Sequence, residues 1–97
     1  MPYETDTDVL EEVLIDEADK HTDDPARLVV FNDDHNTFDW VITCLVKVLK
    51  HTTEQAEQLS YIIHFKGKAT VKTDSLKVLR PYRDALIERG LSAIIQE

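Results

Sequence analysis

Apolar positions along the chain follow two different patterns, which predict a strand in one segment and a helix in the next. Residues 28–31 form an uninterrupted apolar run of strand length, flanked by polar residues. Farther on, apolar residues recur three, four and seven positions apart, which is the spacing of one helix face. These residues are Phe38, Val41, Ile42, Leu45, Val48 and Leu49. We therefore expect a strand at 28–31 and a helix that ends near His51.

A second helix is predicted in the stretch that follows. Thr52 or Thr53 suits its N-cap, and Gly67 suits its C-terminal end. The helical period places one set of residues inward and another outward. The inward set is Ala56, Leu59 and Ile63, and the outward set is Glu54 and Glu57.

The C-terminal third predicts a strand, a helix and a last strand. Residues 68–73 alternate polar and small apolar side chains, as a strand does, and residues 75–89 have a helical pattern. Pro81 lacks a backbone N–H, so this helix should kink or restart there before it ends at Gly90. Residues 91–95 then form a final apolar strand. The expected core residues of this helix are Leu76, Leu79, Leu86 and Ile87.

The order strand, helix, helix, strand, helix, strand defines the expected fold class. Three short strands cannot bury both faces of their sheet, so helices must cover one of them. The sequence therefore predicts an α+β fold, a small three-stranded antiparallel sheet covered on one face by three helices.

Acidic residues are concentrated at the start of the chain. Residues 1–26 hold ten of the nineteen Asp and Glu and a single Lys, whereas residues 27–97 are close to neutral. Two structures fit this segment. One is a short helix after Asp8 with Val9, Leu10, Val13 and Leu14 on one face, and the other is a mobile, solvated arm. We expect a mostly mobile N-terminal extension at 1–26 with some helix, followed by a core domain at 27–97.

The net charge of −8 disfavours two classes of partner, nucleic acids and anionic membrane surfaces, because like charges repel. No apolar run approaches the 18 or so residues of a membrane span, and no basic-then-apolar start indicates a secretory signal. The single Cys44 cannot form an internal disulfide, which fits a reducing cytoplasm. We therefore expect a cytoplasmic domain without nucleic-acid or membrane partners.

The polar run from Asn32 to Thr37 is the main candidate for chemistry. Its side chains can bond their own backbone, and Thr37 suits the N-cap of the following helix, with Trp40 where a complete capping box has Glu. Asp33, Asp34 and His35 could ligate a metal, but consecutive side chains point in different directions. A polar turn that caps a helix is the favoured interpretation.

Cys44 and His64 are two further candidates for a functional residue. Cys44 has no His three or four positions away, so it is interpreted as helix packing rather than as a nucleophile. His64 lies one turn after Ser60 and next to Ile63, which places it at the rim of the buried face. A His at such a rim most often bonds a carbonyl. Site chemistry alone therefore predicts no catalytic residues, and an enzyme is not expected.

Two motifs at a set separation resemble the ClpS adaptor family, the bacterial recognition component of the N-end rule. That family has an Asn-Asp-Asp turn after its first strand, then a helix, then a second helix ending in His with Gly-Lys-Ala soon after. Here these are Asn32-Asp33-Asp34 and the run from His64 to Ala69. Gln58-Leu59 and Ala56 also fall at family positions. The motifs span residues 30–69, and the order of elements agrees over 27–97.

The resemblance implies a function for these motifs. A ClpS-like domain holds the free α-amino group of an N-degron peptide, buries its bulky hydrophobic first side chain and passes the protein to a Clp AAA+ unfoldase. No cofactor or metal is implied. The implied α-amino ligands are Asn32, Asp33, Asp34 and His64. The implied pocket residues are Asn36, Thr37, Phe38, Val41, Ser60, Ile63 and Leu91.

Four positions of the predicted site depart from the family pattern, and the helix with Pro81 departs from its commoner form. Thr is common where this chain has Asn36, Pro where it has Thr37, and Met where it has Phe38 and Ser60. Ser60 is smaller and more polar than Met. We therefore expect a roomier pocket with a more polar floor, which favours aromatic first residues, Trp included, over Leu.

The remaining expectations concern partners and rival functions. The unfoldase would be ClpA-like or ClpC-like, the chain a monomer, and the extension either engaged by the unfoldase or only solubilising. One rival is a general interaction module, because the family fold resembles the C-terminal domain of the ribosomal stalk protein. The less favoured rival is a small metal-dependent enzyme that uses Asp33, Asp34, His35 and His64.

Overall fold

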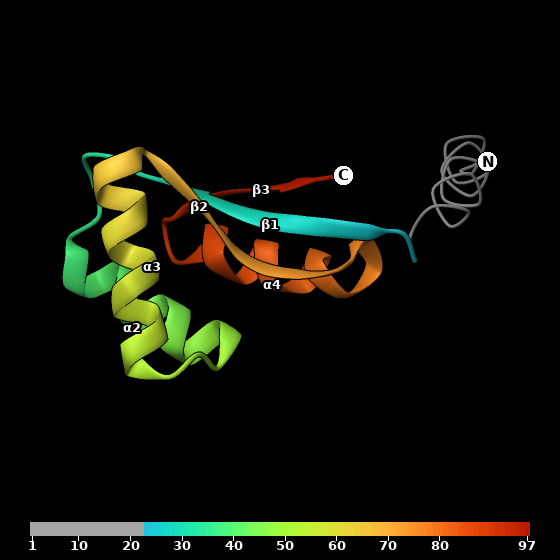
Figure 1. Cartoon of the computed structure of the whole chain (residues 1–97), viewed down its shortest axis with the longest axis horizontal. Helices are drawn as coiled ribbons and strands as arrows, with labels where there is room; N and C mark the ends of the chain where they lie inside the picture. The colour runs from blue at the N-terminus through green and yellow to red at the C-terminus, as the bar shows by residue number, and fades with distance from the viewer. Residues whose placement is uncertain (1–22) are drawn as a thin grey trace, which may run out of the picture.

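The computed structural model describes residues 23–97, which form three strands and three helices in the expected order (Figure 1). The acidic extension falls almost entirely outside these residues, so its expected mobility and partial helix remain predictions. The elements are β1 (Pro25–Phe31), α2 (Phe38–Leu49), α3 (Thr53–Lys66), β2 (Lys68–Ser75), α4 (Leu76–Glu88) and β3 (Ser92–Gln96).

β1 is the central strand of a three-stranded sheet with the order β2-β1-β3. It pairs antiparallel with both neighbours, and Val30 lies opposite Ala69 on one side and Ala93 on the other. Leu28 and Val30 are almost fully buried. The three helices lie on one side of the sheet (Figure 1), so the predicted α+β fold is confirmed.

Helix α4 runs along the sheet and supplies Leu79 and Leu86 to the core, both fully buried as expected. The prediction that Ile87 is also a core residue is wrong, because its side chain is 49% exposed. Successive residues of a helix point about 100° apart, so Leu86 and Ile87 cannot both face the sheet. Neither α4 nor any other helix within residues 23–97 combines the length and the apolar character that crossing a bilayer requires.

The helix ends follow from local capping. The Thr37 hydroxyl accepts a hydrogen bond from the backbone N–H of Trp40 at 3.0 Å, as predicted. Thr52, rather than Thr53, caps α3 and forms a complete capping box with Gln55. Gly67 ends α3 with a backbone φ of +92°. Residues that carry a Cβ rarely adopt this backbone conformation. These caps fix where α2 and α3 begin and end.

Two prolines lie at an expected break in a helix and at the start of the first strand. Helix α4 continues through Pro81, so of the two expected alternatives, a kink or a restart, the restart does not occur. Buried residues on both sides of it, Leu79 and Leu86, hold the helix against the sheet. β1 begins at Pro25, two residues before the expected start of the core domain, and the next residue, Ala26, is only 3% exposed.

Candidate functional site

The turn after β1 is organised by the carboxylate of Asp33. Its Oδ1 accepts hydrogen bonds from the backbone N–H groups of His35 at 2.9 Å and Asn36 at 3.0 Å. The Asn36 side-chain amide lies 2.9 Å from both Asp33 oxygens, and the Ser92 hydroxyl donates to Oδ2 at 3.2 Å. Partial burial alone would raise the pKa of Asp33, but these hydrogen bonds outweigh it and hold the pKa below its usual 3.8. Asp33 is therefore an ionised anchor of the turn.

Two long-range hydrogen bonds place this turn against other elements. The backbone N–H of Asn32 donates to the carbonyl of Gly67 at 2.9 Å, which joins the end of β1 to the end of α3. The Asn36 side-chain amide donates to the carbonyl of Gly90 at 2.8 Å. Asn32 is thereby held beside the last turn of α3, which carries His64.

The turn, the start of α2 and the last turns of α3 enclose a small cavity of about 20 Å³. Helix α3 contributes three residues spaced three and four positions apart, which lie on one helix face. We call this space the α2–α3 cavity. Its lining residues are Asn32, Asn36, Phe38, Val41, Ser60, Ile63 and His64.

The lining of the α2–α3 cavity is apolar on one side and polar on the other. Val41 and Ile63 are buried, whereas Asn32 and His64 are exposed at the rim. Ser60 is 2% exposed, and its hydroxyl has no hydrogen-bond partner among residues 23–97. A buried hydroxyl without a partner is costly, so Ser60 has hydrogen-bonding capacity for whatever enters the cavity.

Four of the expected site residues do not line this cavity. Asp33 is engaged within the turn, and Asp34 is exposed. The Thr37 hydroxyl caps α2, and Leu91 is 4% exposed within the core. The structure therefore gathers seven of the eleven residues around one cavity and leaves these four beside it.

Sequence reasoning missed an aromatic cluster next to the cavity. The ring of Phe38 lies 4.9 Å from that of Tyr61, which stacks on Phe65 at 6.0 Å. His64 contacts Phe65 edge-on at 5.0 Å. Tyr61 is 54% exposed and Phe65 is 74% exposed, an unusual amount for large apolar side chains. Their spacing of four positions beside His64 was the signal that could have revealed this cluster.

The described residues offer little support for metal or thiol chemistry. Within residues 23–97, no group of three or more His, Cys, Asp or Glu side chains is arranged to hold a metal ion. Cys44 is 1% exposed, and burial raises the pKa of its thiol although Arg89 acts in the opposite direction. A buried, protonated thiol of this kind serves packing.

Comparison with known proteins adds an independent observation. The family model for the ATP-dependent Clp protease adaptor protein ClpS matches residues 21–93. The chain belongs to the ClpS family. The ClpS adapter of Thermosynechococcus vestitus is 33% identical over 67 residues, which cover 68% of this chain and 71% of the relative. That of Neisseria meningitidis is 28% identical over 88 residues, covering 82% and 85%.

A solved ClpS structure has the same fold. Agrobacterium tumefaciens ClpS2, bound to L-phenylalaninamide, matches this chain with a TM-score of 0.68 at 18% identity. The match covers 74% of this chain and 94% of ClpS2. The fold therefore agrees with the family match, and the chain is a ClpS adaptor of the Clp protease.

Proposed function

We propose that this ClpS chain binds the free α-amino group and the bulky first side chain of N-degron proteins and delivers them to a Clp unfoldase. The convergence of seven expected residues on one cavity carries this proposal. ClpS2 of A. tumefaciens has been solved with L-phenylalaninamide, a compound that combines a free α-amino group with a phenyl side chain. Such a ligand matches a polar rim beside an apolar wall.

The α-amino group is held at the rim. The side-chain carbonyl of Asn32 and a neutral ring nitrogen of His64 both accept hydrogen bonds from an ammonium group. Each hydrogen bond to a charged group contributes about 1.5–3 kcal/mol. The carboxylate of Asp33 has its oxygens engaged by the turn, so it acts by charge and by positioning Asn32, while exposed Asp34 adds a second negative charge.

The first side chain is buried between α2 and α3. The cavity of about 20 Å³ is smaller than the roomy pocket expected from Ser60, and a space of this size holds about one water molecule. A bulky side chain therefore enters only if a lining residue moves. Phe38 is that residue, because it is half-buried at the cavity and rests on the exposed ring of Tyr61. Burial of a Leu or Phe side chain then contributes about 1.5–3 kcal/mol.

Ser60 gives the pocket its polar floor. Its hydroxyl is buried and unpartnered, so it accepts a hydrogen bond from a first residue that carries a donor, such as the indole N–H of Trp. Leu carries no such donor. This hydrogen bond favours Trp over Leu, and the small size of Ser60, which leaves room for a ring once the cavity opens, extends the preference to aromatic first residues in general.

Delivery completes the proposed function. The partner is a ClpA-like or ClpC-like AAA+ unfoldase in the cytoplasm, and the adaptor acts as a monomer without a cofactor or catalysis of its own. The extension that the unfoldase engages is the part of residues 1–26 that precedes β1, which begins at Pro25. Nucleic acids and membranes are not partners, in keeping with the net charge of −8.

Calorimetric titration with a short Phe-first peptide and its N-acetylated twin tests this function. The free peptide should bind with roughly micromolar affinity. Acetylation removes the positive charge of the α-amino group and a hydrogen-bond donor, so the acetylated peptide should not bind detectably. His64→Ala should weaken binding at least tenfold, whereas His35→Ala, in the exposed part of the turn, is the matched control. Equal binding of the two peptides would instead favour a general interaction module.

A further inference from the structure

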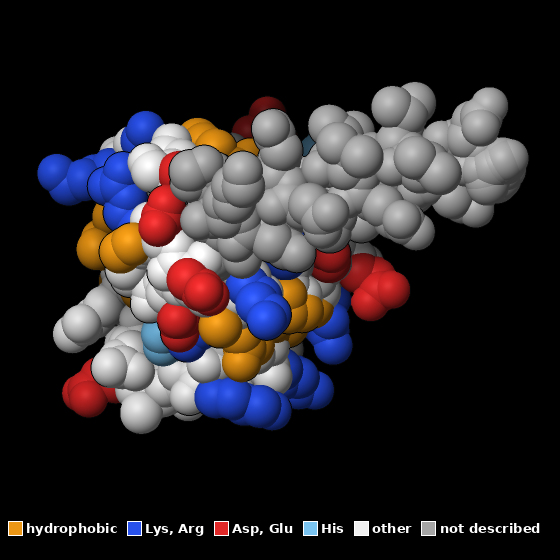
Figure 2. All heavy atoms as spheres, turned by 90° about the vertical axis from the view of Figure 1, so that its right-hand side faces the viewer, with side chains coloured by type: hydrophobic (Ala, Val, Ile, Leu, Met, Phe, Trp, Pro, Cys, Tyr) orange, Lys and Arg blue, Asp and Glu red, His pale blue; other side chains and the backbone are white. Residues whose placement is uncertain are grey.

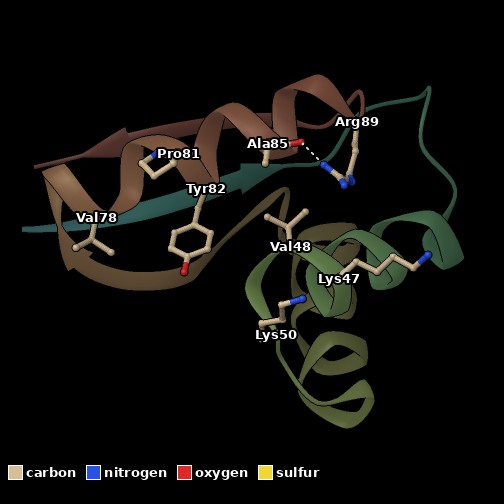
Figure 3. A pocket seen from close by; sticks show the side chains of 8 residues that line it. All are labelled: Lys47, Val48, Lys50, Val78, Pro81, Tyr82, Ala85 and Arg89. Carbon is tan, nitrogen blue, oxygen red and sulfur yellow. Dashed lines mark hydrogen bonds between the residues drawn. The ribbon is translucent and has the colours of Figure 1, made fainter.

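A second and much larger hollow lies between α2 and α4, on a surface that the proposed peptide site does not use (Figure 3). Its volume is about 620 Å³. Val48 projects into it from α2, and Tyr82 projects from α4. We call it the α2–α4 groove. Its apolar lining consists of Val48, Val78, Pro81, Tyr82 and Ala85.

Charged side chains of one sign border this groove. Lys47, Lys50 and Arg89 are among its lining residues, and no Asp or Glu of residues 23–97 is. Lys72 adds a further positive charge, because its ammonium lies 5.3 Å from the centre of the Tyr82 ring. Figure 2, which views the right-hand side of Figure 1, shows hydrophobic side chains on this face with Lys and Arg beside them and Asp and Glu side chains at its margin. An occupant that matches this surface is amphipathic and acidic.

The beginning of the chain has that chemistry. Residues 1–22 carry eight Asp and Glu and a single Lys. Their apolar residues have the spacing of one helix face, with acids between and around them. These apolar residues are Val9, Leu10, Val13 and Leu14.

The chain also enters the fold at one end of the groove. Pro25 of β1 pairs with Ser75, immediately before the first residue of α4, so β1 begins beside the end of α4 that carries Val78. From Val78 to Arg89 the groove follows about 16 Å of helix. Residues 16–22 can span up to about 23 Å when extended, so the apolar residues at 9–14 can reach any part of it. Attachment to the same chain gives them an effective concentration in the millimolar range.

We propose that residues 9–17 dock in the α2–α4 groove of their own chain. The apolar residues of this segment contact Val48, Val78 and Tyr82, and its acids face Lys47 and Lys50. This intramolecular contact is separate from the α2–α3 cavity, so it stands or falls independently of peptide binding.

Paramagnetic broadening in the full chain tests this docking. A spin label is attached at Thr7→Cys, and Cys44 does not compete for the reagent because it is 1% exposed. At low salt, the amide signals of Val48, Val78 and Ala85 should lose more than half their intensity. Signals of Thr70 and Lys66 should keep theirs. An absence of broadening at the groove, or equal broadening everywhere, overturns the proposal and leaves the groove to a partner protein.

A charge variant distinguishes docking from chance proximity of the label. The double variant K47Q/K50N removes two positive charges, and Asn tolerates the left-handed conformation of position 50, where φ is +62°. It should restore at least half of the lost intensity, as should 0.5 M salt. The matched control K66Q/K68Q changes two lysines outside the groove and should restore none. Broadening that is unchanged in K47Q/K50N contradicts the proposal.

Discussion

The side-chain amide of Asn36 donates a hydrogen bond to the carbonyl of Gly90, 2.8 Å away and 54 positions later in the chain. The same amide also contacts the carboxylate of Asp33. The turn that presents Asn32 is thereby fixed against the loop between α4 and β3. The geometry of the proposed α-amino site depends on this link between the two halves of the domain.

Asn36→Ala should destabilise the fold, because it removes hydrogen bonds to both Asp33 and Gly90. We expect the free energy of unfolding to fall by about 1–3 kcal/mol, measured by urea denaturation. Ser92→Ala removes only the 3.2 Å hydrogen bond to Asp33 and should cost less than about 1 kcal/mol. If Asn36→Ala costs no more than Ser92→Ala, the link to Gly90 does not support the turn.

The lowered pKa of Asp33 predicts that the stability of the fold depends on pH. Its pKa is lower in the folded chain than the usual 3.8, so the ionised carboxylate stabilises the fold above that pH. The stabilisation is lost as the pH falls through the folded-state pKa. Urea denaturation of the native chain and of Asp33→Asn should therefore show a constant difference in unfolding free energy between pH 5 and 7 and a shrinking one below 3.8. A difference that persists unchanged at pH 3 would contradict this role.

The sequence predicted most of the fold because its signals are local. Thr37 and Gly67 cap their helices by hydrogen bonds to residues three or four positions away. The spacing of apolar residues also indicated each helix without information on tertiary contacts. Strand order is different, because β1 pairs with two strands that lie far away in the sequence, and no local pattern specifies that choice. The continuity of α4 through Pro81 was not predictable for the same reason, since it depends on buried residues on both sides of the proline that pack against the sheet.

The candidate site was predictable only in part. Spacing alone placed His64 at a rim, and the family resemblance was needed to associate it with Asn32. The small volume of the cavity was not predictable, because it depends on how side chains of α2 and α3 pack against each other, as Phe38 and Tyr61 do. The α2–α4 groove was also missed, since it is formed by side chains of elements that are distant in sequence.

Ser60→Ala should change which first residues are preferred. The native chain should bind Trp-first and Phe-first peptides more tightly than a Leu-first peptide of otherwise identical sequence. Loss of the hydroxyl removes one neutral hydrogen bond, worth about 1 kcal/mol, so the ratio of Trp to Phe affinities should fall about fivefold. Fluorescence anisotropy with the three peptides measures this. A marked preference of the native chain for Leu would refute the polar-floor interpretation.

Removal of residues 1–22 should separate binding from delivery. The described core retains every residue of the α2–α3 cavity, so affinity for a Phe-first peptide should change less than twofold. Degradation of a Phe-first protein by a ClpA-like or ClpC-like protease should be lost, because the unfoldase no longer has an extension to engage. Degradation at the native rate by the shortened chain would show that this segment only improves solubility.

A crystal structure of this chain with L-phenylalaninamide is the most direct test of the proposed peptide site. We predict that the ammonium group lies within hydrogen-bond distance of the Asn32 side-chain oxygen and a His64 ring nitrogen. The phenyl ring should lie between Val41 and Ile63, with Phe38 displaced from its present position. A ligand bound in the α2–α4 groove, or an ammonium group that contacts neither Asn32 nor His64, would contradict the account.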